Sequence, residues 1–190
     1  MTISLVEHSN VYPMPLNIFH FSITGISRAC LQEVVRHNFG FSVESTRYTL
    51  NKKLKNEPSF LPLEDNEDRL AKYLCRTGHK DIDKAAAETL ERIRELATQN
   101  ISGDLLKYAL GEAFLVDLML TTDVPTLANF FRLRSSSAAL WEIRTLSHAM
   151  YNVLPEYYQV YFKPTGEYLS TIDKSTRTAI KVDNNRWRVI

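Results

Sequence analysis

The sequence lacks a marked excess of charge of either sign. Its 23 lysines and arginines nearly balance its 22 aspartates and glutamates, so the formal net charge at pH 7 is only +1. A protein that binds nucleic acid over a broad surface needs a basic face, and this composition argues against that class. An anion bound by this chain must therefore be held by a local group of cations.

Cysteine is scarce. The two cysteines, Cys30 and Cys75, have no CxxC partner, so neither a disulfide framework nor a zinc site is indicated. We expect both thiols to be reduced and packed. No metal is predicted either, because metal-ligand spacing is missing among His8, His20, His79 and His148.

Long apolar runs and common nucleotide-binding or hydrolase motifs are also missing. No window approaches the roughly 18 apolar residues of a membrane span, and the first residues, MTISLVEHSNVYPMPLN, lack a basic region followed by an apolar one. We therefore expect a cytoplasmic protein. The patterns GxGxxG, GxxxxGK[ST] and GxSxG do not occur, which argues against Rossmann, P-loop and hydrolase-elbow sites.

Apolar periodicity predicts the elements of the first third of the chain. Residues 16–24 alternate apolar and polar side chains, as in a half-buried strand. The following GISRACLQEVVRHN has helical spacing, whereas FSVESTRYTL is rich in β-branched and aromatic residues and is predicted to be extended. Pro58 and Pro62 interrupt the polar residues 51–65, which predicts a long surface excursion.

The rest of the chain is predicted to be mostly helical. Asp81 is the expected cap of the most regular amphipathic helix, Gly111 is a weak point inside another, and serines 135–137 are candidate caps for the last helix, which ends at Pro155. The apolar pattern stops after Phe162, so we expect one domain over residues 1–162 and a C-terminal extension over residues 163–190. The predicted helices cover residues 66–76, 81–100, 102–122, 125–133 and 138–154.

A polar stretch, RHNFGFSVESTRYTL (residues 36–50), holds the first candidate site residues. Arginines near helix ends can bind anions, because free backbone N–H groups and the guanidinium both favour negative charge. The alternative for each is an ordinary surface arginine, and His37 could simply cap the last carbonyls of its helix. The candidate cations are Arg36, His37, Arg47, Arg132 and Arg134.

The same stretch resembles the signature RHRxxSxNExSxRY of the flavin-dependent thymidylate synthases (ThyX). With one residue deleted, the matching positions are Arg36, His37, Ser45, Arg47 and Tyr48. DLLKYALGEAF, which contains Lys107, resembles a second block of that family, and TLANFFRLRSSSAALWEI resembles its SLxNFLxLR and WEI block. FHFSITGISRACLQEVVRH is similar to the run before the signature, so the four blocks follow the family's order over residues 16–162.

The resemblance implies an α/β (α+β) fold with a central, mostly antiparallel sheet flanked by helices. It implies a homotetramer with active sites between subunits, and no nucleic-acid or membrane partner. The implied reaction converts dUMP to dTMP, with methylenetetrahydrofolate as carbon donor, FAD as cofactor and NADPH as reductant. In such an enzyme the cofactor supplies the redox chemistry, and the protein supplies orientation and charge.

The resemblance also implies roles for individual residues. Ser45, Arg47 and Lys107 would bind the phosphate of dUMP through charge-assisted hydrogen bonds. Arg134 would be the catalytic residue, binding dUMP and polarising its uracil ring. The residues that would contact FAD are Arg36, His37, Asn38 and Asn129.

Positions on the nucleotide side match the family better than those on the flavin side. Asp123 and Pro125 stand where the family has an Asn-x-Arg pair that helps to bind FAD, and Asn38 stands at or beside the deleted arginine position. Two alternatives therefore remain open. One is a non-catalytic subunit that retains the nucleotide pocket, and the other is an enzyme that hydroxymethylates C5 of a pyrimidine nucleotide.

Overall fold

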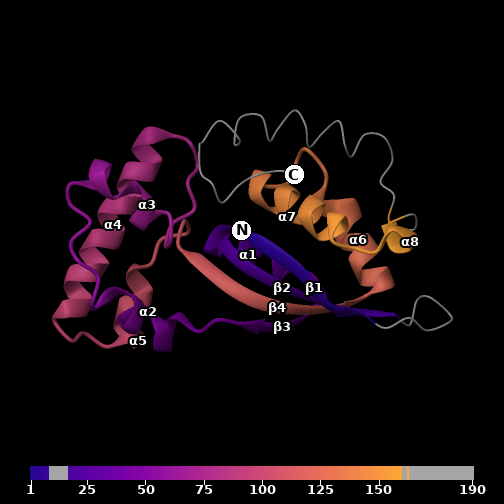
Figure 1. Ribbon diagram of the computed structural model, residues 1–190, viewed down its shortest axis with the longest axis horizontal. Coiled ribbons are helices and arrows are strands. Elements are labelled where there is room, and N and C mark those ends of the chain that lie inside the picture. Colours follow the sequence, from indigo (N-terminus) through magenta and orange to yellow (C-terminus); the bar gives the residue numbers. More distant parts are fainter. Residues whose placement is uncertain (9–16, 160–161, 163–190) are drawn as a thin grey trace.

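The computed structural model describes residues 1–8, 17–159 and 162, so the predicted extension over residues 163–190 lies outside the described residues. Four strands form the sheet, and helices lie on one of its faces and beyond one of its ends (Figure 1). In chain order the elements are β1 (Thr2–His8), β2 (Ile18–Ser27), α1 (Arg28–Val34), β3 (Gly40–Val43), α2 (Thr46–Leu54), η2 (Leu63–Asn66), α3 (Glu67–Leu70), α4 (Lys80–Thr98), α5 (Gly103–Leu106), η3 (Lys107–Ala109), β4 (Leu115–Asp123), α6 (Val124–Arg134), α7 (Trp141–Asn152) and α8 (Glu156–Gln159).

The sheet has the strand order β1-β2-β4-β3, and every neighbouring pair is antiparallel. Alternate side chains of β2 and β4 point to one face, where Phe19, Phe21, Ile23, Leu118 and Leu120 are buried. Helices α1, α6 and α7 pack on the sheet, and Figure 1 shows α6 and α7 above it. The predicted fold class, a mostly antiparallel sheet flanked by helices, is confirmed.

A second group of helices, α2 to α5, lies beyond one end of the sheet (Figure 1). Its longest member, α4, buries Leu90, Ile93 and Ala97 along one stripe, which confirms the amphipathic helix predicted there. The predicted cap is wrong, because His79 occupies the N-cap position. Asp83 instead accepts hydrogen bonds from the backbone N–H groups of Thr77 and Gly78, at 2.7 and 3.1 Å.

The segment predicted to be extended over residues 41–50 changes structure halfway. β3 ends at Val43, and α2 begins at Thr46 with Ser45 as its N-cap. Thr46, Leu50 and Leu54 are buried at helical spacing, and α2 packs against α5 and α4. Packing of this face outweighs the strand preference of its β-branched and aromatic residues.

The helix predicted over residues 102–122 is the largest error. The helical part ends at Ala109, and residues 115–123 form the central strand β4. A short apolar run inside a sheet cannot be told from a buried helix by periodicity alone. β1 was not predicted, and the helix predicted over residues 66–76 is confined to α3 and the adjoining turn η2.

The predicted serine caps of the last helix are also wrong. Leu140 is the N-cap of α7, while Ser135 is the C-cap of α6 and its hydroxyl donates to the carbonyl of Phe131. Arg144 reaches back from α7 and donates to the carbonyls of Ser137 and Ala139, so the serine-rich segment is a turn held from within the fold.

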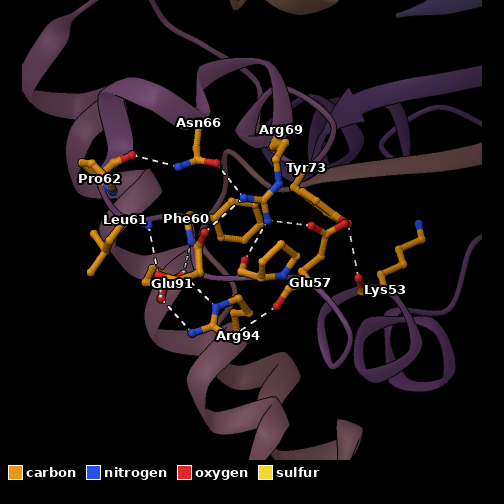
Figure 2. Close-up of polar contacts among 12 residues, drawn as sticks. Lys53, Glu57, Phe60, Leu61, Pro62, Asn66, Arg69, Tyr73, Glu91 and Arg94 are labelled. Carbon is orange, nitrogen blue, oxygen red and sulfur yellow. Dashed lines mark hydrogen bonds and ion pairs between the residues drawn. The ribbon is translucent and has the colours of Figure 1, made fainter.

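A polar network holds the proline-containing loop before α3 in place (Figure 2). We call Glu57, Phe60, Arg69, Glu91 and Arg94 the Phe60 clamp. Arg69 Nη2 donates to Glu57 at 2.7 Å, and its guanidinium lies over the buried Phe60 ring, 4.6 Å from the centroid. Glu91 accepts from the Phe60 backbone N–H at 2.9 Å and from both ends of the Arg94 guanidinium. The predicted surface excursion is therefore anchored at its centre.

Both cysteines are free and buried, as predicted. Among the helices that the structure describes, none combines the length and the apolar character required to cross a membrane. Within the same residues, His, Cys, Asp and Glu side chains form no group of three or more that could hold a metal ion.

Candidate functional site

The end of α6 meets the end of α1 in a charged group that we call the Arg134 cluster: Glu33, Arg36, His37 and Arg134. Arg134 is the last residue of α6, and Glu33 lies in the last turn of α1. Arg134 Nη1 donates to Glu33 Oε2 at 2.6 Å, and Nη2 donates to the Glu33 carbonyl at 3.2 Å. Arg36 Nη1 lies 3.0 Å from the other oxygen of the same carboxylate, Oε1. One carboxylate therefore bridges two arginines.

His37 is a second anchor of Arg134. Arg134 Nε donates to His37 Nε2 at 2.8 Å, and because arginine cannot accept a hydrogen bond, this nitrogen of His37 must carry no proton. The ring stacks on Phe39 at 5.5 Å and meets Phe130 edge-on at 5.0 Å. Burial, together with the nearby Arg134 charge, lowers the pKa of His37. The imidazole is thus kept neutral, with its proton on Nδ1.

Arg134 has donors to spare. Three of its five N–H groups meet acceptors on Glu33 and His37, and the part of the chain that the structure describes offers no acceptor for the other two. The side chain is 16% exposed. A guanidinium held on one edge and free on the other can polarise a carbonyl oxygen without reorganising.

A second group, the Arg47 cluster, consists of Ser45, Arg47, Asp104 and Lys107 at the junction of α2 and α5. Arg47 pairs with Asp104 through Nε and is half exposed. Ser45, at the N-terminus of the nine-residue α2, makes no side-chain capping bond. Lys107 lies in η3 and is exposed. The positive end of α2, Arg47 and Lys107 thus lie on contacting elements, α2 and η3, and groups of this kind suit a phosphate.

Close helix packing creates the Arg47 cluster. Gly103, the first residue of α5, is buried against the Arg47 carbonyl oxygen. A Cβ at Gly103 would overlap that oxygen, so a larger residue there must push α5 away from α2. The glycine therefore allows α5 to approach α2 closely enough for Asp104 to pair with Arg47.

The two clusters lie beyond opposite ends of one strand. His37 precedes β3 and Ser45 follows it, and four residues of strand rise about 13 Å. The residues predicted to hold the nucleotide are therefore divided, with Arg134 at one end of β3 and Ser45, Arg47 and Lys107 at the other.

Two predicted site residues, Asn38 and Asn129, are exposed. Asn129 accepts from Arg132 Nη2 at 2.8 Å on the surface of α6. Asp123, at one of the altered family positions, caps α6 by accepting from the Thr126 N–H at 2.8 Å. At this position the aspartate therefore has a structural role, because it caps the first turn of α6.

Sequence reasoning missed Glu33 and Asp104, the carboxylates of the two clusters. Glu33 had a usable signal, because a glutamate three residues before Arg36 on a helix forms an ion pair. Asp104 had none, since only the contact between α2 and α5 brings it to Arg47.

A cavity of about 390 Å³ lies elsewhere, between α3 and the first turns of α4. Leu70, Leu74, Cys75, Arg76 and Asp83 are among its lining residues, and no member of either cluster lines it. Arg76 is already paired with Glu67 at 2.8 Å.

Comparison with known proteins bears directly on these clusters. The model of the family described as thymidylate synthase complementing protein (Thy1) matches residues 3–158, which include both clusters. The flavin-dependent thymidylate synthase of Campylobacter jejuni strain RM1221 is 43% identical over 161 residues, covering 84% of this chain and 72% of the relative. The enzyme of the same name from Helicobacter pylori strain 26695 is 38% identical over 148 residues, covering 76% and 71%.

The three-dimensional match agrees with the sequence match. A crystal structure of Helicobacter pylori ThyX in complex with FAD and dUMP superposes with a TM-score of 0.76 at 38% identity, covering 78% of this chain and 73% of that one. A family match over most of the chain and relatives of this similarity lead to one conclusion: the chain belongs to the thymidylate synthase complementing protein family, that of the flavin-dependent thymidylate synthases.

Proposed function

We propose that the protein is a flavin-dependent thymidylate synthase, which converts dUMP to dTMP with FAD as its cofactor. The observation that carries the proposal is the Arg134 cluster. It presents a fixed arginine with free donors, in a chain whose relatives are named for this reaction. Methylenetetrahydrofolate is the proposed carbon donor, and NADPH the proposed reductant.

Nucleotide binding is assigned to both clusters. Ser45, Arg47 and Lys107 bind the phosphate, and Arg47 exchanges its exposed pairing with Asp104 for this more highly charged partner. Arg134 binds the uracil ring and stabilises negative charge on its carbonyl oxygen as C5 becomes nucleophilic. The neutral His37 and the carboxylate of Glu33 keep its donors aimed in one direction.

Flavin binding is assigned to Arg36, His37, Asn38 and Asn129. The donor set fits a flavin dinucleotide, because Arg36 is 65% exposed and the two amides are exposed, so they can bind a pyrophosphate or the polar edge of the ring. FAD supplies the hydride transfer. The protein's own residues hold it beside the nucleotide.

We further propose a homotetramer in which one copy supplies the Arg134 cluster and another supplies the Arg47 cluster. The separation of the clusters along β3 supports this arrangement. So does an exposed apolar patch beside Arg47 and Lys107, formed by Tyr48, Leu105 and Tyr108, whose exposed fractions are 66, 65 and 86%. Exposed aromatic residues of this kind are enriched in protein interfaces.

The test is to purify the full chain, measure flavin absorbance, and assay dTMP formation from dUMP, methylenetetrahydrofolate and NADPH. We expect bound FAD and turnover, with dUMP binding weakened by Arg47→Ala. Binding of dUMP without turnover at saturating FAD would instead identify a non-catalytic nucleotide-binding subunit. Mass spectrometry of the product separates methylation from hydroxymethylation.

A further inference from the structure

Lys53 forms a two-point ion pair with the residue that precedes the N-cap of α2. Its Nζ lies 2.6 Å from Oε1 of Glu44 and donates to Oε2 at 2.9 Å. Glu44 follows β3 directly and stands one residue before Ser45, the N-cap of α2. The side chain of Glu44 is 19% exposed and that of Lys53 is 38% exposed, so salt screens this pair less than a fully exposed one.

The pair lies on a different side of α2 from Arg47. An α-helix turns by about 100° per residue, so the step of six residues from Arg47 to Lys53 places their side chains about 120° apart around the axis. Lys53 instead shares the side of Thr46, which is buried. Long helical side chains lean toward the N-terminus of their helix, and Lys53 meets Glu44 in this way. The ion pair therefore keeps the Glu44 carboxylate away from the Arg47 side.

The start of α2 has groups that would accept a carboxylate in place of a phosphate. Ser45 makes no side-chain capping bond, and the first backbone N–H groups of a helix have no partner within it. Anions of either kind are favoured at this end of a helix. An unrestrained glutamate directly before the N-cap would compete with a phosphate for these donors and for Arg47.

We propose that Lys53 is a positioning residue that holds Glu44 away from the proposed phosphate site and so favours nucleotides that carry a phosphate. This inference rests on the proposed function, which assigns the phosphate to Ser45, Arg47 and Lys107. Lys53 itself does not bind the phosphate. Its effect passes through Glu44, because removing the ammonium leaves a negative charge free beside the N-terminus of α2.

The backbone at Lys53 is fixed independently of its side chain. The Tyr73 hydroxyl lies 3.2 Å from the Lys53 carbonyl oxygen and donates to Glu57 at 2.8 Å. Figure 2 shows the Lys53 side chain pointing away from these residues. Both contacts remain when the ammonium is removed. A change at Lys53 therefore tests the ion pair without breaking the contact of α2 with the Phe60 clamp.

The test compares dUMP with deoxyuridine, which lacks the phosphate, by calorimetry on the full chain with FAD present. In Lys53→Met we expect dUMP affinity to fall about fivefold, because a freed negative charge repels the phosphate. Deoxyuridine affinity should change by less than about twofold, and so should dUMP affinity when Lys53→Met is made on the Glu44→Gln background. An unchanged dUMP affinity overturns the proposal. An equal loss on both backgrounds also overturns it, because Lys53 would then act on the phosphate directly.

Matched variants separate this effect from a change of net charge or of folding. Lys52→Met removes the same charge from the adjacent, exposed position of α2 and should change dUMP affinity by less than about twofold. Lys53→Arg keeps a cation that can pair with Glu44, so it should retain the wild-type dUMP affinity. If Lys53→Met does not fold, Lys53→Gln takes its place with the same expectations. A loss no greater than that of Lys52→Met overturns the proposal in either case.

A failure of the proposed function is recognised separately, because the wild type would then bind no dUMP or make no dTMP. Inorganic phosphate then serves as the probe, and the backbone amide signals of Thr46 and Arg47 are followed by nitrogen-15 NMR. We expect the phosphate affinity measured from these signals to fall about fivefold in Lys53→Met and to recover when Glu44→Gln is added. No response to phosphate in the wild type, or equal affinities in the wild type and Lys53→Met, would overturn the inference.

Discussion

The Phe60 clamp and the Arg134 cluster both pair an arginine with a glutamate. They differ in how many of the arginine N–H donors already have an acceptor. Arg69 donates four hydrogen bonds, to Glu57, Asn66 and two backbone carbonyls, and also covers the Phe60 ring. Arg134 makes three and keeps two donors available. An arginine paired with a carboxylate therefore indicates a binding site only when N–H donors remain for a ligand.

The carboxylates differ in the same way. Glu91 in the clamp accepts four hydrogen bonds from Ser59, Phe60 and Arg94, and the Arg94 hydrogen bonds lower the pKa of Glu91 to about 2. These bonds tie a loop to a helix. Glu33 ties two arginines to each other, so we expect changes at the clamp to affect stability and changes at the cluster to affect activity.

The largest expected effect is on turnover. Arg134→Ala should lower kcat for dTMP formation by about 10²- to 10³-fold, as is typical when a donor to a developing oxyanion is removed. Stability should fall as well, because the side chain is only 16% exposed and its removal leaves the Glu33 carboxylate paired with Arg36 alone, so kcat is measured on the folded fraction. Retention of more than a tenth of kcat would contradict the role assigned to Arg134.

At the Phe60 clamp we expect a change of comparable free energy, but in protein stability rather than in turnover. Glu91→Ala leaves Arg94, whose side chain is 14% exposed, without its carboxylate, and should lower the free energy of unfolding by about 3 kcal/mol. Urea denaturation measures this. The kcat of the folded fraction should stay near the wild-type value. A loss of kcat without a loss of stability would contradict the expectation that the clamp affects stability and the Arg134 cluster affects activity.

The pH dependence should differ in a smaller but diagnostic way. The pKa of His37 is lowered by burial and by Arg134, so its stabilising contribution is present above its ordinary value of 6.5 and is lost as the pH falls through the folded pKa. Wild-type protein should therefore lose more stability than His37→Gln between about pH 7.5 and 5.5. Equal losses would mean that His37 is not held neutral.

The matching experiment at the clamp uses Glu91→Gln. Because the pKa of Glu91 falls from 4.5 to about 2 on folding, its contribution is present above pH 4.5 and disappears as the pH falls toward 2. Glu91→Gln should therefore remove an acid-induced loss that begins below the range in which His37 acts. Unfolding free energies measured across both ranges test this order.

The smallest effect is expected for an arginine pair that belongs to neither region. Arg92 and Glu95 pair at 2.8 Å on the solvent side of α4, with side chains 65 and 42% exposed. Arg92→Ala should change the free energy of unfolding by less than about 0.5 kcal/mol and leave kcat unaltered. A larger change would show that side-chain exposure does not predict how much such an ion pair contributes to the free energy of unfolding.

The sequence predicted some elements well and others badly, for physical reasons that can be named. The periodicity of residues 81–100 was sufficient because α4 packs through a single stripe. The strand β4 was mistaken for a helix because the exposed Met119 lies between the buried Leu118 and Leu120, and this apolar run hides the alternation of buried and exposed residues. Of the site residues, Arg36, His37 and Arg134 were predicted and are in one cluster, whereas Glu33 and Asp104 were missed.

By itself the sequence determined the family, through motifs whose order survives one deletion, and it determined which cations are candidates for an anion site. Only the tertiary structure decided how those cations are grouped. Arg134 and Arg36 share one carboxylate, while Arg47 and Lys107 lie beyond the other end of β3. Motifs record residue identity along the chain, but hydrogen bonds depend on distances of a few ångströms, which folding alone establishes.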